Sequence, residues 1–284
     1  IFYIYVVDDD NILKGRLSLK KMILSPTSTK IQSIYNPDVT YVTTDEPAES
    51  VGRIMQKYDL VAIPVVDSIG RLVGRITIDD VVDVIREEAE KDYQMMSGIS
   101  QDVESSDTIW DQTKARLPWL IIGLFGGMLA AYMISFYEAD IALFPATAMF
   151  IPVITAMGGN VGIQSSAIVV KGLASNTLTS KNILQSISKE ISCAVINACI
   201  CSSIIFILSL CFNLTSLAMP ITVTISLFIV IMFASMFGTA FPLLLNKLKI
   251  DPALATGPFI TLTNDIIGLN IYLFTGKAIL GWLL

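Results

Sequence analysis

Five long apolar segments dominate the later part of this 284-residue chain and limit what it can fold into. They cover residues 118–137, 142–173, 184–211, 219–245 and 258–284. Each is long enough to cross about 30 Å of hydrocarbon as a helix. The mean hydropathy of +0.66 is also far above that of an ordinary soluble protein. We therefore expect an all-α transmembrane bundle of five helices over residues 118–284.

The charged residues are concentrated ahead of these segments. Residues 1–117 hold 13 of the 19 Lys and Arg residues and 20 of the 25 Asp and Glu residues, which gives them a net charge of −7. This region therefore reads as soluble and acidic, which disfavours nucleic acid as a partner and favours cations. The chain has no His, so histidine-based catalytic triads and zinc sites are excluded, and we do not expect an enzyme.

The loops between the apolar segments alternate in charge. Lys171 and Lys181 flank the loop after the second segment, and Lys247 and Lys249 lie in the loop after the fourth, whereas the loop after the first is acidic. Cytoplasmic loops carry an excess of positive charge. The pattern predicts a multi-pass protein of the cell membrane with its soluble region in the cytoplasm and its C-terminus outside.

An internal repeat divides the soluble region. Residues 5–22 align without a gap on residues 64–81, at an offset of 59, and six of the aligned pairs are identical. Each copy has the pattern of a strand, a turn, a second strand and a helix. The second copy is preceded by a segment with its own predicted helix, which the first copy lacks. We therefore expect a partial first domain over residues 1–37, a second domain over residues 38–91, and more chain upstream.

Polar residues interrupt two of the apolar segments. The last segment carries a carboxylate, Asp265, just after Thr and Asn residues at 261–264. A charge inside a membrane is costly unless it faces protein, water or a cation. In the second segment, Pro152 and the glycines of Gly158–Gly162 predict a broken helix that lines an aqueous path. The alternative is helix packing through small residues, which we expect for Gly123 and Gly127 in the first segment.

A strongly acidic helix is predicted over residues 79–92. Spacings of three and four place Asp80, Asp83 and Glu87 on one of its faces. Their mutual repulsion would be relieved by bound Mg²⁺ or Ca²⁺, because both ions prefer carboxylate oxygens. A solvated helix face also tolerates such a cluster, so both interpretations stay open at this point.

Residues 63–85, IPVVDSIGRLVGRITIDDVVDVI, resemble the C-terminal half of a CBS domain. With the repeat, this resemblance implies an α+β CBS-domain pair ahead of the transmembrane bundle. It also implies nucleotide binding, of ATP for example, with Thr77 and Asp80 contacting the ribose. The alternative is that both residues only start the helix, one as a cap and the other as a first-turn acid.

Two further segments resemble signature segments of the MgtE family of magnesium transporters and channels. They read MGGNVGIQSSAIVVKGLA at 157–174 and DPALATGPFITLTNDIIGLNIYLF at 251–274. The order of a CBS pair, an acidic helix and five spans also matches. The resemblance implies that Mg²⁺ crosses the lipid bilayer through a homodimeric pore, with other divalent cations as further candidates. It places pore residues at five positions: Asp265, Asn160, Gly158, Gly159 and Thr261.

The resemblance also implies gating by cytoplasmic Mg²⁺, through a connecting or "plug" helix over residues 92–117 and a set of sensor acids: Asp80, Asp83, Glu88 and Asp92. Two departures from the family pattern concern this gating. Lys91 stands where an acid is expected, and Gly257 stands where some relatives carry a polar residue. Two alternative functions are a CBS-regulated channel for another ion and a membrane-anchored CBS nucleotide sensor without transport.

Overall fold

The computed structural model describes residues 3–175, 177–178, 183–211, 217–255 and 257–283, and the chain divides into two compact units. The units are Ile1–Glu90 and Lys91–Leu284. Lys181, which contributes to the predicted membrane orientation, lies outside the described residues. The predicted fold class, an α+β region followed by a helical region, is confirmed.

The first unit contains two small sheets and short helices. Its elements are β1 (Tyr3–Val7), β2 (Leu13–Ser18), α1 (Leu19–Leu24), the 3₁₀ helix η1 (Ile31–Ser33), β3 (Val42–Thr43), α2 (Ala48–Lys57), β4 (Ala62–Val66), β5 (Leu72–Thr77) and the start of α3 (Ile78–Met96). Strands β1 and β2 form an antiparallel hairpin. In the second sheet β4 lies between β3, which is parallel to it, and β5, which is antiparallel to it.

The sequence repeat is also a structural repeat. An offset of 59 residues places β1 on β4 and β2 on β5, with the same bounds and the same register shift within the hairpin. The equivalent turn residues Asn11 and Gly70 both adopt positive φ, which these two residue types tolerate best. The turns also bond to each other, since Leu13 N donates to Gly70 O and Leu72 N donates to Asn11 O.

Apolar side chains from α2, α3 and the second sheet form the core of this unit. Met55 of α2 and Ile63 of β4 are fully buried in it. Gly52 allows α2 to approach α3, because a Cβ at this position would lie 3.3 Å from a methyl of Val81. This packing fixes the start of α3, where the sequence places its candidate nucleotide and sensor residues.

The second unit is helical and contains long apolar helices. Its elements are the end of α3, then α4 (Ile109–Ser135), α5 (Glu138–Leu143), α6 (Ala146–Ala174), α7 (Ile183–Leu210), α8 (Ala218–Lys247), the 3₁₀ helix η2 (Pro252–Ala255) and α9 (Pro258–Leu283). Among the described residues, four helices are long and apolar enough to span a membrane: α4, α6, α7 and α8. The fifth predicted span coincides with α9, a continuous helix whose first half carries the polar residues at 261–265.

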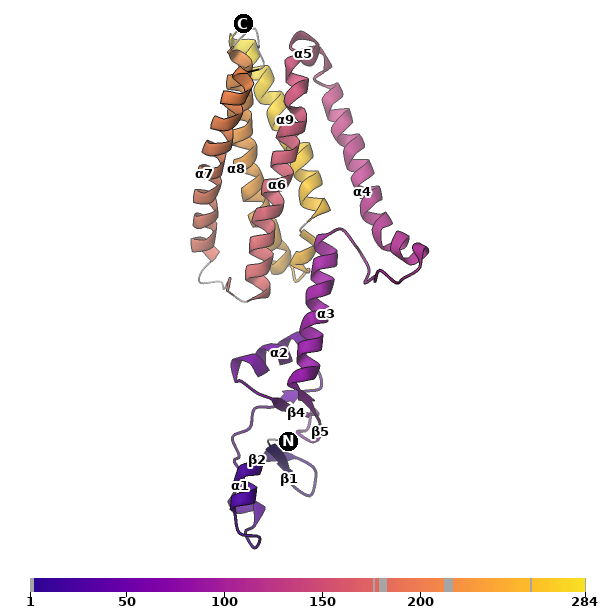
Figure 1. The fold of residues 1–284 in the computed structure, drawn as a ribbon, viewed down its shortest axis with the longest axis vertical. Helices are drawn as coiled ribbons and strands as arrows, with labels where there is room; N and C mark the ends of the chain where they lie inside the picture. The colour runs from indigo at the N-terminus through magenta and orange to yellow at the C-terminus, as the bar shows by residue number, and fades with distance from the viewer. Residues whose placement is uncertain (1–2, 176, 179–182, 212–216, 256, 284) are drawn as a thin grey trace. The chain divides into compact units, whose positions relative to one another are not determined.

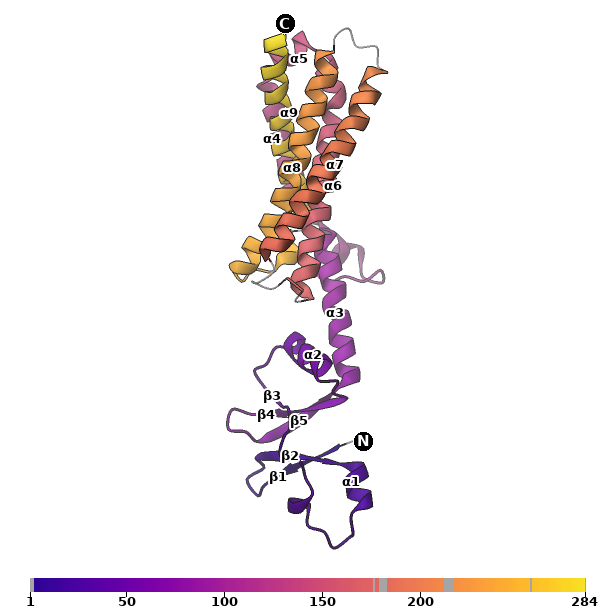
Figure 2. The same cartoon turned by 90° about the vertical axis from the view of Figure 1, so that its left-hand side faces the viewer.

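Helices α6, α7, α8 and α9 lie side by side, as both views show (Figure 1, Figure 2). Helix α8 packs against the other three, and its buried residues Val223, Leu227 and Ile231 form the centre of the core. Tyr272 of α9 completes this core and donates a hydrogen bond from its hydroxyl to the carbonyl of Thr147. Helix α4 packs against α9 through Gly126, whose missing side chain makes room for Leu262.

The prediction that the second apolar segment is broken is wrong. Helix α6 is continuous from Ala146 to Ala174 with Pro152 inside it. Proline removes a single backbone donor near the start of the helix, and packing against α8 and α9 preserves the rest. The glycines serve instead as sites of close helix contact.

The prediction of one connecting helix over residues 92–117 is also wrong. Helix α3 continues to Met96, residues 97–108 are not helical, and α4 begins at Ile109. Gly98 adopts a φ of 77°, a conformation typical of the position just after a helix end. Thr108 then caps α4, since its side chain accepts a hydrogen bond from Asp111 N.

Candidate functional site

The glycines of α6 lie directly against the polar segment of α9. A Cβ on Gly159 would lie 3.1 Å from the Thr261 methyl and 3.4 Å from Asp265 Oδ1, and one on Gly162 would collide with the Asn264 amide. Glycine is therefore required for α6 to approach α9 this closely. The two segments that the sequence singled out as an ion path thus meet in space.

Asp265 is half-buried in this contact. Within the described part of the chain its carboxylate has neither a hydrogen-bond partner nor a basic partner. An unpaired carboxylate in an apolar helix is costly unless it faces water or a cation. Its surroundings therefore suit a bound or passing cation.

Asn264, beside it, is a residue that the sequence did not single out as a site. It is 1% exposed, and neither its Oδ1 nor its Nδ2 has a partner among the described residues. A buried polar group without a partner costs about 1–3 kcal/mol. The sequence showed only its polarity, because its burial depends on the contact between α6 and α9.

The other predicted pore residues occupy different surroundings. Gly158 and Gly159 are buried, with Gly158 against Val230 and the Asn264 carbonyl. The hydroxyl of half-buried Thr261 donates to the Gly257 carbonyl at 3.1 Å. Asn160 is exposed in the single chain. The structure thus brings Gly159, Thr261 and Asp265 together and leaves Asn160 on an open face of α6.

A second carboxylate of the helical unit is tied into the bundle. Glu190 of α7 accepts hydrogen bonds at Oε1 from Ser165 Oγ of α6, at 2.6 Å, and from Ser235 Oγ of α8, at 3.1 Å. Both serines are almost fully buried. Glu190 therefore joins three helices, whereas Asp265 has no such partners in the part of the chain that the structure describes.

In the first unit, Asp80 closes the start of α3. Its Oδ2 accepts hydrogen bonds from Thr77 N at 2.9 Å and from Thr77 Oγ1 at 2.6 Å. These bonds, the one from the Thr77 hydroxyl above all, hold the pKa of Asp80 below its ordinary value of 3.8. Asp80, in the first turn of α3, therefore bonds back to Thr77 just before the helix, as a residue that helps to start a helix does.

The candidate sensor acids are not gathered into a site within one chain. Among the described residues, no group of three or more acidic or Cys side chains could hold a metal ion. Asp80 and Asp92 lie twelve residues apart on the continuous helix α3, which corresponds to roughly 18 Å of helix rise. Glu90, between them, pairs with Arg86 at 2.8 Å. A shared cation between these acids would thus need ligands from beyond a single chain.

A pocket of about 170 Å³ in the first unit includes one of the candidate nucleotide residues. Thr77 and Arg75 line it together with Tyr3 and Tyr5, and burial raises the pKa of Tyr5. Asp80 does not line this pocket, since its carboxylate is turned to Thr77. The pocket combines aromatic rings, a guanidinium group and a hydroxyl.

The connector contacts the start of α9 within the second unit. Gly257 has a φ of 67°, and a side chain there would collide with the Met96 carbonyl. A Cβ on Gly98 would lie 2.6 Å from Pro258 Cγ. Residues 96–98 therefore lie against the beginning of the helix that carries Asp265.

Comparisons with known proteins identify both regions of the chain. Residues 151–275 match the family model MgtE, described as a divalent cation transporter, and residues 31–87 match the CBS domain model. A structure described as the cytosolic domain of the Mg²⁺ channel MgtE in complex with ATP is 52% identical over 30% of this chain and 34% of that chain, with a TM-score of 0.29.

Curated relatives extend over nearly all of this chain and are named as transporters. The magnesium transporter MgtE of Bacillus subtilis is 36% identical over 272 residues, which cover 96% of this chain and 60% of the relative. That of Thermus thermophilus is 34% identical over 286 residues, which cover 99% of this chain and 62% of the relative. The chain thus spans about three-fifths of the length of these relatives. Residues 151–275 thus carry the MgtE family domain, described as a divalent cation transporter, and a CBS domain precedes it at residues 31–87.

Proposed function

We propose that this chain transports Mg²⁺ across the cell membrane through a pore formed by two copies. The observation that carries the proposal is the half-buried carboxylate of Asp265, which has no partner among the described residues and lies against Gly159. The names of the relatives support Mg²⁺ as the substrate. Other divalent cations are further candidates, because a carboxylate favours hard cations in general.

Mg²⁺ gives up its hydration shell reluctantly and is usually bound with several waters in place. Asp265 residues from two copies would hold such a hydrated ion between them. Thr261, Gly158 and Gly159 shape the adjoining wall, and Asn160 adds an amide on the open face of α6. In this arrangement the ion offsets the cost of placing the carboxylates in a membrane.

Two features support a homodimer in the predicted orientation. Gly123 and Gly127 lie on a face of α4 where a Cβ would meet nothing within 4 Å, so this small-residue pair is available to another copy. Lys171 and Lys247 lie in the last turns of α6 and α8, which favours the cytoplasmic side for these ends. The CBS region would then be cytoplasmic and the C-terminus outside.

We further propose that cytoplasmic Mg²⁺ closes the pore. Two copies would bring the acids of α3 together, with Asp80, Asp83, Glu88 and Asp92 as the ligands. The contacts of Met96 and Gly98 with residues 257–258 support a transfer of this movement to α9. The pocket beside Thr77 supports ATP as a second ligand of the CBS region.

The test is Mg²⁺ flux into liposomes that contain the purified 284-residue chain. Asp265→Asn should reduce flux to that of empty liposomes, because the amide no longer attracts the cation. Thermal unfolding and mass should stay those of the parent protein. The control Glu138→Gln removes an exposed carboxylate of the same unit and should leave flux unchanged.

Normal Mg²⁺ flux through Asp265→Asn would exclude this carboxylate from the pore. No flux of any divalent cation through the parent, combined with ATP binding, would favour the nucleotide sensor instead. Flux of another ion, with Mg²⁺ excluded, would favour a CBS-regulated channel of different selectivity.

A further inference from the structure

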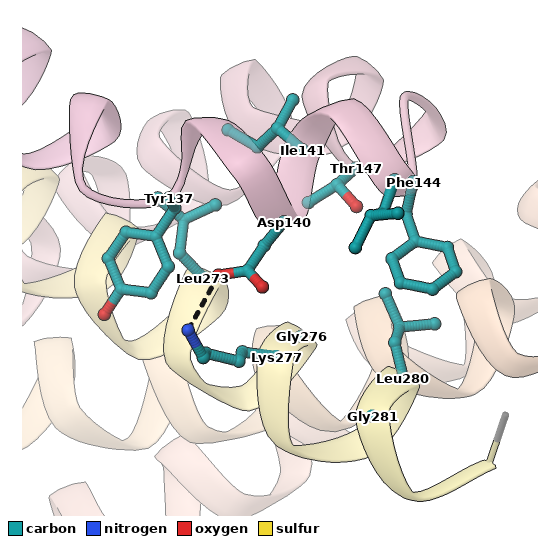
Figure 3. Close-up of a pocket in the computed structure, with 11 residues that line it drawn as sticks. Tyr137, Asp140, Ile141, Phe144, Thr147, Leu273, Gly276, Lys277, Leu280 and Gly281 are labelled. Atoms are coloured by element: carbon teal, nitrogen blue, oxygen red, sulfur yellow. Dashed lines mark hydrogen bonds and ion pairs between the residues drawn. The ribbon is translucent and has the colours of Figure 1, made fainter.

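A pocket of about 430 Å³ lies in the helical unit where α5 faces the last turns of α9 (Figure 3). Residues 273, 276, 277, 280 and 281 of α9 line it, and their spacing defines one helix face. Ile141, Leu143 and Phe144 supply apolar walls on the opposite side. Gly276 and Gly281 leave the α9 wall partly free of side chains. The pocket is thus apolar, with its charged groups confined to one ion pair.

That ion pair joins Lys277 of α9 to Asp140 of α5. Lys277 Nζ donates to Asp140 Oδ2 at 3.0 Å, the dashed line in Figure 3. The side chains are 60% and 31% exposed, so the pair lies at the rim of the pocket. Exposed ion pairs contribute little to stability, and this one can open towards a ligand that carries both charges.

The position of the pair along the helices corresponds to a membrane surface. Lys277 follows the first residue of α9, Pro258, by 19 positions, or about 28 Å of helix. This is close to the hydrocarbon thickness of about 30 Å. Asp140 likewise precedes the start of α6 at Ala146. Both charges therefore lie at the level expected for lipid headgroups, and Leu273, one turn before Lys277 in α9, lies on the hydrocarbon side of them.

We propose that this pocket binds a membrane phospholipid with a phosphoethanolamine headgroup. The lipid phosphate pairs with Lys277, its ammonium pairs with Asp140, and the upper part of an acyl chain packs against Leu273 and Phe144. This assignment is independent of the proposed transport function, because it uses neither Asp265 nor the acidic helix.

The two charges also determine which headgroup fits. A primary ammonium group has three N–H donors for the Asp140 carboxylate, whereas a choline headgroup has none. A glycerol headgroup carries no positive charge, so it would leave Asp140 beside a phosphate without a partner. Charge-assisted hydrogen bonds are about twice as strong as neutral ones, and the pocket should therefore prefer phosphatidylethanolamine.

The experiment measures lipid retained by the purified, delipidated chain in native mass spectrometry. Lipids with identical acyl chains and with ethanolamine, choline or glycerol headgroups are added separately. The parent should bind phosphatidylethanolamine about tenfold more tightly than the other two, as expected for one additional charge-assisted hydrogen bond. Asp140→Asn should abolish this preference, whereas Lys277→Gln should weaken the binding of all three lipids, because all three carry the phosphate that pairs with Lys277. Lys247→Gln, which removes an exposed charge from the last turn of α8, should retain the preference.

Equal binding of the three lipids by the parent would overturn the proposal. So would displacement of bound lipid by soluble phosphoethanolamine at matched concentration, because the acyl chain would then contribute nothing. If Asp140→Asn lowers the melting temperature equally in all lipids and leaves the preference intact, the pair only fastens α5 to α9. If either variant dissociates a dimer in every lipid, the occupant of the pocket is a second copy of the chain.

Discussion

Asp265 and Asn264 are neighbours in the chain, yet the fold gives them opposite surroundings. Asp265 is half-buried and can reach water or an ion at the face of α9, whereas Asn264 is enclosed between α6 and α9. The amide has no partner among the described residues, so it requires an ordered water or a shift of the helices to satisfy it. Gly162 leaves the space that this amide occupies, since a Cβ there would collide with Asn264 Nδ2.

Thr77 illustrates how one side chain can serve both the fold and a ligand. Its hydroxyl donates to Asp80 and also lines the pocket proposed for nucleotide. Thr77→Val keeps the shape of the side chain and removes the hydroxyl. The pKa of Asp80 should then rise towards its ordinary value, because the hydrogen bond from the Thr77 hydroxyl, the main cause of the lowered pKa, is lost.

The sign of the pH effect follows from the lowered pKa. A carboxyl group whose pKa is lower in the folded state than in the unfolded state stabilises the folded state when the pH is above its unfolded-state pKa. This stabilisation is lost as the pH falls through its folded-state pKa. The parent should therefore lose more stability than Thr77→Val between about pH 5 and pH 2, as followed by circular dichroism.

ATP affinity should also fall in Thr77→Val. Thr43→Val removes an exposed hydroxyl elsewhere in the unit and should change neither. An unaltered pH profile in Thr77→Val would contradict the assignment.

At the level of helices, glycine determines how closely α6, α8 and α9 pack. Gly238 of α8 meets the backbone of Gly162 on α6, and Gly162 in turn meets Asn264 of α9. These glycines lie inside helices, where alanine would favour the helical backbone by about 1 kcal/mol. Close approach of the helices is therefore obtained at the expense of local helix propensity.

Gly238→Ala should destabilise the helical unit by about 1–3 kcal/mol, because the new methyl meets a backbone carbonyl that cannot move alone. The measurement is thermal unfolding in detergent. Gly281→Ala is the matched control, since a Cβ there meets nothing within 4 Å, and it should leave stability unchanged or raise it slightly. A Gly238→Ala protein as stable as the parent would show that α6 and α8 are not packed this closely.

Local sequence patterns predicted most of these elements, and tertiary contacts account for the errors. Hydropathy located the five spans within a few residues of α6, α7, α8, α9 and the end of α4, because apolar composition is a local property. The repeat predicted both hairpins. Pro152 and the glycines were misread as helix breaks because their effect depends on α8 and α9, which the local sequence does not show. The connector was misread because Gly98 and Thr108 end and start helices within a segment taken as one.

At the scale of the whole molecule, the proposed gating requires two copies of the acidic helix α3. In a single chain the four candidate sensor acids are distributed along α3. Among the described residues, no group of three or more acidic or Cys side chains could hold a metal ion. In a dimer, unbound carboxylates should push the two α3 helices apart, and Mg²⁺ should draw them together. A ligand shifts such an equilibrium only by its difference in affinity for the two states. Each ion needs to favour the closed form by only about 1–3 kcal/mol for several to act as a steep switch.

The corresponding prediction concerns a fourfold variant: Asp80→Asn, Asp83→Asn, Glu88→Gln and Asp92→Asn. It should remove both repulsion and cation binding, so liposome flux should no longer fall as Mg²⁺ rises on the CBS side. Protection from proteolysis by added Mg²⁺ should disappear as well.

A control with the same change in charge replaces four exposed acids away from α3: Asp9→Asn, Asp10→Asn, Asp38→Asn and Asp59→Asn. The pore of the control variant should close at the same Mg²⁺ concentration as that of the parent, because only the arrangement of acids on α3 allows two copies to share ions. If the fourfold α3 variant also closes at that concentration, the sensor lies elsewhere and α3 is a solvated acidic face. If the control loses closure too, net charge rather than a defined site sets the response.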